Sequence, residues 1–184
     1  MSNPENLIEK TLTSNELFSG MFMQLMHDTV ELPDGTHGVR EYIKHGGAVA
    51  MIAITKDNEI VLERQYRHPV NQIMIELPAG KLEKGEIELE AAKRELQEET
   101  GFTGNDWTCL GHCLPCIGYS SEKIIYYLAK NVIPGPSKLD EGEFVETFTI
   151  PFNEFVSMAY NGEVTDSKTL AGIMLYQGYL LKNH

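Results

Sequence analysis

The sequence predicts a mixed α/β fold in layers, preceded by a small antiparallel β region. Short apolar runs typical of strands alternate along the chain with a few helical patterns, which is the order of elements in mixed layered folds. A length of 184 residues is typical of one domain with a small appendage. The apolar fraction of 42% and the charged fraction of 23% are those of a globular protein and exclude disorder, collagen and coiled coil as descriptions of the whole chain.

The first 45 residues predict the antiparallel region. Strand-like segments at residues 21–30 and 39–43 flank Pro33-Asp34-Gly35, a strong turn signature. Gly46-Gly47 then marks a break in composition. We therefore expect an N-terminal β region over residues 1–45 and a second domain over residues 46–184.

The chain from residue 48 predicts the layered domain. Residues 48–55 are apolar up to a final threonine, which is typical of a buried strand. A turn at residues 56–58 leads to a second strand at 59–66, and Pro78-Ala79-Gly80 closes a third strand. The remaining expected elements are a helix over 87–100, strands over 107–114, 123–128 and 144–150, and helices over 152–160 and 167–181.

The net charge of −12 comes from 27 acidic and 15 basic residues. It disfavours binding to nucleic acid or to an anionic membrane, because phosphates select Lys and Arg. Both a cation-binding protein and a merely solvated acidic surface fit this charge. The polar start of the chain and the lack of an 18-residue apolar run predict a cytoplasmic protein without a membrane span.

The cysteines cluster with a histidine, at Cys109, His112, Cys113 and Cys116. Zinc and reduced thiols are the two interpretations. A single C-x-x-C without a second pair favours reduced thiols.

Three carboxylates gather on one side of the helix expected at 87–100. Glu95 and Glu99 are four residues apart, and Glu98 lies three residues after Glu95. Like charges at this spacing destabilise a helix unless a cation lies beside them. Oxygen-only ligands suit Mg²⁺, Mn²⁺ or Ca²⁺, so the alternatives are a metal site and a solvated Glu-rich helix.

The spacing around these glutamates decides between the two interpretations. Residues 80–102 read GKLEKGEIELEAAKRELQEETGF. Every fixed position of the Nudix box is filled: Gly80, Glu86, Arg94-Glu95-Leu96, Glu98-Glu99, Gly101 and the bulky Phe102. So many matches over 23 positions make chance improbable.

The chain therefore resembles the Nudix hydrolases, which use divalent cations to hydrolyse nucleoside diphosphates linked to another group. The resemblance implies a mixed β-sheet core sandwiched between helices, and two or three Mg²⁺ ions, with Mn²⁺ as the alternative. It makes Glu95 and Glu99 the main metal ligands and the Ala79 carbonyl a further ligand. Glu98 would assist in metal binding and is also counted among the catalytic residues. The implied structural residues of the motif are Gly80, Glu86, Arg94 and Gly101.

Four further segments are similar to the ADP-ribose pyrophosphatase branch of this family: residues 65–67, 75–80, 118–122 and 166–169. The similarity implies hydrolysis of a nucleoside diphosphate sugar, first of all ADP-ribose, to AMP and ribose 5-phosphate. It implies that Arg67 contacts the diphosphate, with a surface cation as the alternative, and it assigns Glu76 and Ser121 to substrate binding.

The same branch exchanges its N-terminal region with a twofold partner, which implies a homodimer. Arg40 and Phe22 are then weaker assignments for the base and the terminal ribose, with structural roles as the alternative. The general base is expected on the loop around residues 139–144, with Glu141 as first choice and Glu143 as second. An acidic turn is the alternative for this loop.

Ile117 departs from the branch, which typically has a proline immediately before the glycine matching Gly118. ADP-sugars, GDP-mannose and other diphosphate conjugates therefore stay open as substrates. A domain that senses ADP-ribose without turnover is the alternative of a different class, against which the intact box weighs.

Overall fold

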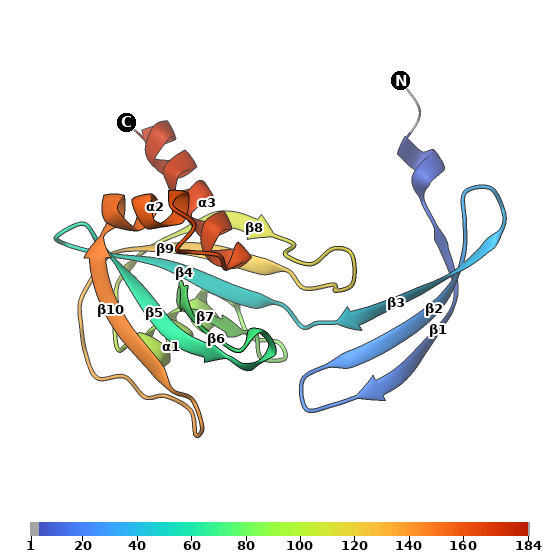
Figure 1. The fold of residues 1–184 in the computed structure, drawn as a ribbon, viewed down its shortest axis with the longest axis horizontal. Helices are drawn as coiled ribbons and strands as arrows, with labels where there is room; N and C mark the ends of the chain where they lie inside the picture. The colour runs from blue at the N-terminus through green and yellow to red at the C-terminus, as the bar shows by residue number, and fades with distance from the viewer. Residues whose placement is uncertain (1–3, 184) are drawn as a thin grey trace. The chain divides into compact units, whose positions relative to one another are not determined.

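The computed structural model describes residues 4–183 in two compact units (Figure 1). Residues 1–3 and 184, which fall in the two expected regions, lie outside the described residues. The first unit consists of the chain up to His45 together with residues Cys116–Glu122, and the second contains the rest. None of the helices within residues 4–183 combines the length and the apolar character needed to cross a bilayer.

The first unit contains a three-stranded antiparallel sheet in the order β1-β2-β3. The expected turn at residues 33–35 is confirmed, and Asp34 stabilises it by accepting bonds from the backbone N and the hydroxyl of Thr36 at 2.9 and 2.6 Å. Sequence reasoning did not separate β1, because polar residues interrupt its apolar ones and its side chains are exposed along its full length. The elements are η1 (Pro4–Leu7), β1 (Lys10–Ser19), β2 (Gln24–Glu31) and β3 (His37–Lys44).

The second unit contains a mixed sheet in the order β10-β5-β4-β9-β8, with β6 paired to β5 and β7 paired to β4. β4 and β9 are parallel, and the other pairs are antiparallel. The expected strands are present within a few residues, but β7 pairs with β4 where the sequence predicts only the close of the third strand. The strands are β4 (Ala48–Thr55), β5 (Glu59–Arg67), β6 (Gln72–Glu76), β7 (Ala79–Lys81), β8 (Asp106–Cys113), β9 (Ile124–Val132) and β10 (Val145–Pro151).

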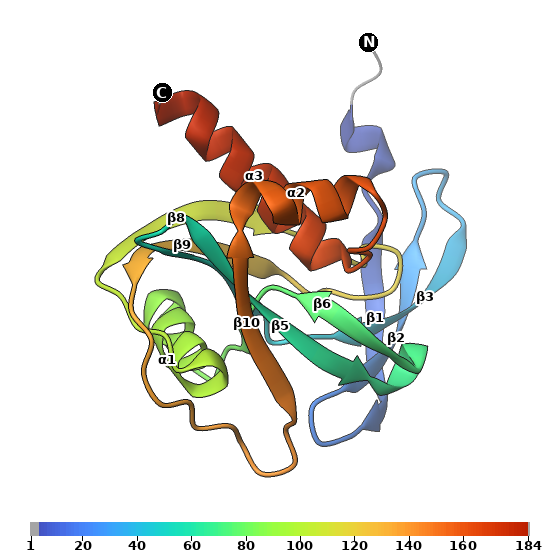
Figure 2. The same cartoon turned by 60° about the vertical axis from the view of Figure 1, so that its left-hand side comes forward.

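Helices cover both faces of this sheet (Figure 2). Helix α1 (Glu88–Thr100) packs on one face, where Val49 and Met51 of β4 meet Leu96. Helices α2 (Phe152–Tyr160) and α3 (Ser167–Asn183) pack on the other face. A strand covered on both faces is apolar throughout, which explains the continuous apolar sequence of β4. The predicted sandwich of a mixed sheet between helices is confirmed.

The alternation of β5 determines which of its side chains reach the α1 face. Val61 packs in the cluster beneath α1, while Ile60 and Leu62 pack in the opposite cluster. Since side chains two residues apart share a face, Glu63 projects on the same side as Val61. The strand therefore delivers one carboxylate to the α1 face of the sheet.

Gly101 ends α1 in a left-handed conformation, with φ +75°, and its N–H donates to the Gln97 carbonyl. A Cβ at this position would lie 2.2 Å from the carbonyl oxygen of Gly135. We expect Gly101→Ala to lower the free energy of unfolding by more than the ~1–2 kcal/mol of the left-handed conformation alone.

Chemical denaturation measures this effect, and Gly85→Ala is the matched control. Gly85 has φ +81° but no atom within 4 Å of the added Cβ, so its variant should lose only the conformational part. Equal losses in the two variants would show that the approach of Gly135 contributes nothing.

Candidate active site

Arg94 connects the loop of the box to helix α1. Its Nε and Nη2 atoms donate to the two carboxylate oxygens of Glu86, both at 2.9 Å. Its Nη1 donates to Glu95 at 2.8 Å and to Glu98 at 3.0 Å. The Arg94 bonds hold the pKa of Glu86 below its usual value. One guanidinium thus holds three of the box glutamates in fixed directions.

Strand β7 brings the start of the box against α1. The Glu95 carboxyl carbon lies 1.9 Å from the position that a Cβ of Gly80 would occupy, so only glycine admits this carboxylate here. The backbone N–H of Ala79 donates to Glu99 at 3.1 Å. The structure therefore brings Glu95 and Glu99 together with Ala79, whose carbonyl the resemblance assigns to metal binding.

Glu99 is a carboxylate in an unfavourable setting. Burial, followed by the charges of Glu63 and Glu95, raises its pKa to about 9. Burial is also the first cause of the raised pKa of Glu95, opposed by its bond to Arg94. Carboxylates with raised pKa values in one place indicate a site that lacks positive charge.

Glu63 belongs to the same group, and sequence reasoning missed it. Its side chain is only 3% exposed, and its Oε1 has no hydrogen-bond partner among the described residues. Burial raises its pKa to about 8, with Glu76 and Glu143 adding to the shift and Lys168 and Arg67 opposing it. The signal in the sequence was a glutamate at a strand position where the alternation calls for an apolar residue.

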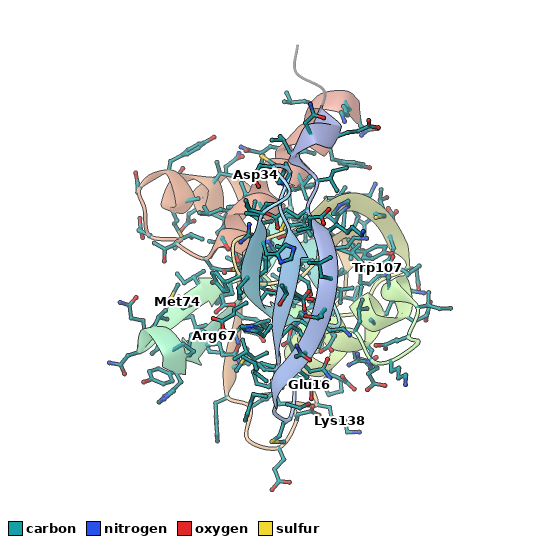
Figure 3. All side chains as sticks on the ribbon, turned by 90° about the vertical axis from the view of Figure 1, so that its right-hand side faces the viewer. Glu16, Asp34, Arg67, Met74, Trp107 and Lys138 are labelled. Carbon is teal, nitrogen blue, oxygen red and sulfur yellow. The ribbon has the colours of Figure 1, made fainter. Side chains whose placement is uncertain are left out.

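Glu76 joins strand β6 to the first residues of α3. It is 3% exposed and receives Arg67 Nε and Nη2 at 2.7 and 2.8 Å, and it also binds Lys168. Lys168 Nζ donates in addition to Asp166 at 2.9 Å. Burial alone would raise the pKa of Glu76, but the two cations outweigh it and lower that pKa. Arg67, labelled in Figure 3, therefore has a partner within the fold and is not a solitary surface cation.

The two loop glutamates differ in their surroundings. Burial is the main cause of the raised pKa values of Glu63, Glu95 and Glu99, and the charge of Glu143 adds a smaller part to each. It also lines a hollow of about 420 Å³ with Tyr66, Ile73 and Phe144 among the walls. Glu141 is exposed in the turn just before it.

Three of the expected substrate residues lie in the first unit. Arg40 is bonded to Glu9, with Nε 2.9 Å from Oε2, and to the carbonyl of Val39. Phe22 is 61% exposed. The hydroxyl of Ser121 accepts the backbone N–H of His45 at 3.0 Å, and so fixes the segment 116–122 to the end of β3.

The three cysteines are unpaired thiols in separate surroundings. Cys113 Sγ lies 3.2 Å from the hydroxyl of Tyr126, and Cys116 accepts the hydroxyl of Tyr119 at 3.2 Å. Within residues 4–183, no three His, Cys, Asp or Glu side chains already stand at metal-binding distances. At the box, Glu95 and Glu98 are turned towards Arg94.

The donor set nevertheless fits a hard divalent cation. The carboxylates of the site and the Ala79 carbonyl offer only oxygen atoms as metal ligands. Such ligands suit Mg²⁺ or Mn²⁺, whereas zinc is commonly bound by thiolates. Glu63 Oε1 has no hydrogen-bond partner among the described residues, and the pKa of Glu99 is raised. Both observations indicate that the site lacks positive charge.

Comparison with known proteins agrees with this geometry. The family model of the NUDIX domain matches residues 44–172. The chain belongs to the Nudix family. A second model, the nucleoside diphosphate sugar hydrolase N-terminal domain, matches residues 9–43. Nudix hydrolases in general depend on divalent metal ions.

Two relatives match nearly the whole Nudix chain. An ADP-ribose pyrophosphatase of Bacillus subtilis (strain 168) is 38% identical over 175 residues, covering 94% of this chain and 95% of its own. A methanol dehydrogenase activator of Bacillus methanolicus is 40% identical over 171 residues, 92% of each chain. Among solved structures, an ADP compounds hydrolase shares the fold, with a TM-score of 0.85 at 22% identity over 95% of both chains.

Proposed function

We propose that this Nudix protein hydrolyses the diphosphate bond of ADP-ribose, giving AMP and ribose 5-phosphate. The observation that carries the proposal is the complete box folded into one group of partly buried carboxylates, with Glu95 against Gly80 and Glu99 bonded to Ala79. The similarity to an ADP-ribose pyrophosphatase along 94% of the chain supports ADP-ribose as the substrate.

The metal ligands in this proposal are Glu95, Glu99, the Ala79 carbonyl and, assisting, Glu98. The ions are Mg²⁺, or Mn²⁺ in its place, and we propose two or three per site. When bound, they neutralise the diphosphate and make its phosphorus open to attack. Arg94 and Glu86 hold the box in shape, together with the two glycines at its ends.

Arg67 and Glu76 form the proposed diphosphate contact. Nε and Nη2 of Arg67 are bonded to Glu76, and this leaves Nη1 outside the pair. A guanidinium fixed on one edge presents the other edge in a set direction, which suits a phosphate oxygen. Lys168 holds Glu76 from the other side.

The chemical step transfers water to phosphorus. The water oxygen forms a bond to one phosphorus, the bridging P–O bond breaks, and a loop carboxylate accepts the proton. Glu143 is favoured as this base because its charge already acts on three carboxylates of the site. Glu141 is the alternative base if the loop moves, and glycine at position 142 restricts the backbone less than any other residue would.

The base assignment predicts unequal losses in two variants. We expect Glu143→Gln to lower kcat by about 10²–10⁴-fold, the usual contribution of a general base, and Glu141→Gln to lower it less. Steady-state kinetics with ADP-ribose measures both. A larger loss in Glu141→Gln would make Glu141 the base and show that the loop closes during turnover.

The first unit supplies the proposed dimer contact. Its sheet exposes several apolar side chains, among them Leu12, Leu17 and Phe18 of β1. Exposed apolar groups in a short sheet support an exchange of residues 1–45 between two copies of the chain. Phe22, Arg40 and Ser121 would then bind the nucleoside or the sugar. A monomeric mass in light scattering would remove this role.

The division after residue 45 and a cytoplasmic location are parts of the same proposal. The three unpaired thiols are consistent with a reducing compartment.

A substrate panel tests the function. We expect the highest kcat/KM with ADP-ribose when ADP-ribose, ADP-glucose and GDP-mannose are compared with Mg²⁺. A preference for GDP-mannose would make GDP-mannose the substrate in place of ADP-ribose. Ile117, which is 79% exposed, leaves this outcome open because it stands where the ADP-ribose pyrophosphatase branch typically has a proline. Binding of ADP-ribose without turnover of any compound would make the chain a sensing domain.

A further inference from the structure

We propose that Glu63, which lies outside the Nudix box, is an additional carboxylate ligand of the divalent cation held by the box. This inference rests on the proposed function, because it adds a residue to the same metal site. It concerns a strand residue that no part of the motif contains.

The position of Glu63 follows from the sheet. β5 places it on the face that α1 covers, next to Val61, which packs beneath that helix. In register it stands opposite Thr147 of β10, and the Thr147 hydroxyl reaches the Glu99 carbonyl at 3.5 Å. Glu63 therefore lies at the C-terminal end of α1, where Glu99 projects.

The burial of Glu63 has no explanation within the protein alone. Its side chain is 3% exposed, and one carboxylate oxygen has no partner among residues 4–183. Leaving such an oxygen unpaired in the interior is destabilising, because it loses its hydrogen bonds to water without replacement. A structural role would require a donor for that oxygen, and the described part of the chain offers none.

The nearby cations are already engaged elsewhere. Arg67 makes its two-pronged bond to Glu76, and Lys168 bonds to Glu76 and Asp166. Arg94 is occupied by Glu86, Glu95 and Glu98. A divalent cation beside Glu99 supplies the charge that Glu63 lacks, and its ligand preference is oxygen.

The experiment measures Mn²⁺ binding without substrate, by the electron paramagnetic resonance signal of free Mn²⁺. We expect Glu63→Gln to raise the dissociation constant at least tenfold over wild type, the scale of losing a supporting ligand. Glu63→Leu should raise it at least as much, because leucine offers no oxygen at all. Glu59→Gln, on the same strand, is the matched control and should bind Mn²⁺ as wild type does.

The outcomes separate this inference from the proposed function. Unchanged Mn²⁺ affinity in Glu63→Gln and Glu63→Leu, with a tenfold or greater loss in Glu99→Gln, would overturn the role of Glu63 alone. Unchanged affinity in Glu99→Gln would overturn the metal site itself. Circular dichroism checks folding, and loss of the fold in both Glu63 variants would overturn the inference in favour of a structural role.

Discussion

Replacing Glu99 by glutamine should lower kcat for ADP-ribose about a thousandfold. Glutamine keeps the size of the side chain and one oxygen, but it removes the charge that holds the cation against the diphosphate. Metal ions contribute several kcal/mol to such reactions, and each 1.36 kcal/mol corresponds to about a tenfold change in rate. The fold should persist, because glutamine can still accept the Ala79 N–H that Glu99 accepts at 3.1 Å.

Steady-state kinetics at saturating Mg²⁺ measures the effect, and Glu90→Gln is the control. Glu90 lies on the same helix, pairs with Lys93 at 2.8 Å and is outside the fixed positions of the box. This variant should keep wild-type turnover. Near-wild-type turnover in Glu99→Gln would contradict the assignment of the metal ligands.

The metal-free protein should become less stable as the pH rises from 5 to 8. The pKa of Glu63 is raised to about 8 and that of Glu99 to about 9, chiefly by burial. A group with a raised folded-state pKa contributes stability below its unfolded value, and this stability is lost as the pH rises towards the folded value. The unfolded carboxyls ionise near pH 4.5, so the loss falls in this window.

We expect a melting temperature roughly 5–15 °C lower at pH 8 than at pH 5 in the presence of a chelator. Carboxylates with a lowered pKa, Glu76 and Glu86, act in the opposite sense and only below about pH 4.5, outside this range. Mg²⁺ should reduce the loss, because it stabilises the ionised forms. A melting temperature that does not fall between these pH values would show that the two buried carboxyls are neutralised within the chain.

Local features of the sequence predicted most of the fold. The apolar run of β4, the turn at residues 33–35 and the glycine that ends α1 each have a short-range cause, and all three are present. β1 and β7 were missed for physical reasons. β1 buries none of its side chains, so no alternation marks it, and the three residues of β7 become a strand only by pairing with β4.

The candidate site also combines features that the sequence predicts with contacts that only the fold creates. Glu95, Glu98 and Glu99 share one side of α1 because of helical spacing, which the sequence contains in full. The partners of these residues come from other elements. Lys168, 92 residues after Glu76, bonds to it. The charge of Glu63 acts on Glu99 only because the sheet that contains β5 packs against α1.

By itself, the sequence determined the box, its carboxylates and the family, because these depend on identities at fixed short spacings. Only the tertiary structure decided which charges lack a partner. Burial and neutralisation depend on groups far apart in the chain, and no local pattern shows that Arg67 and Lys168 both turn to Glu76 while Glu63 is left with an unpaired oxygen. A buried carboxylate oxygen without a partner is energetically unfavourable, and this is the reason for proposing Glu63 as a metal ligand.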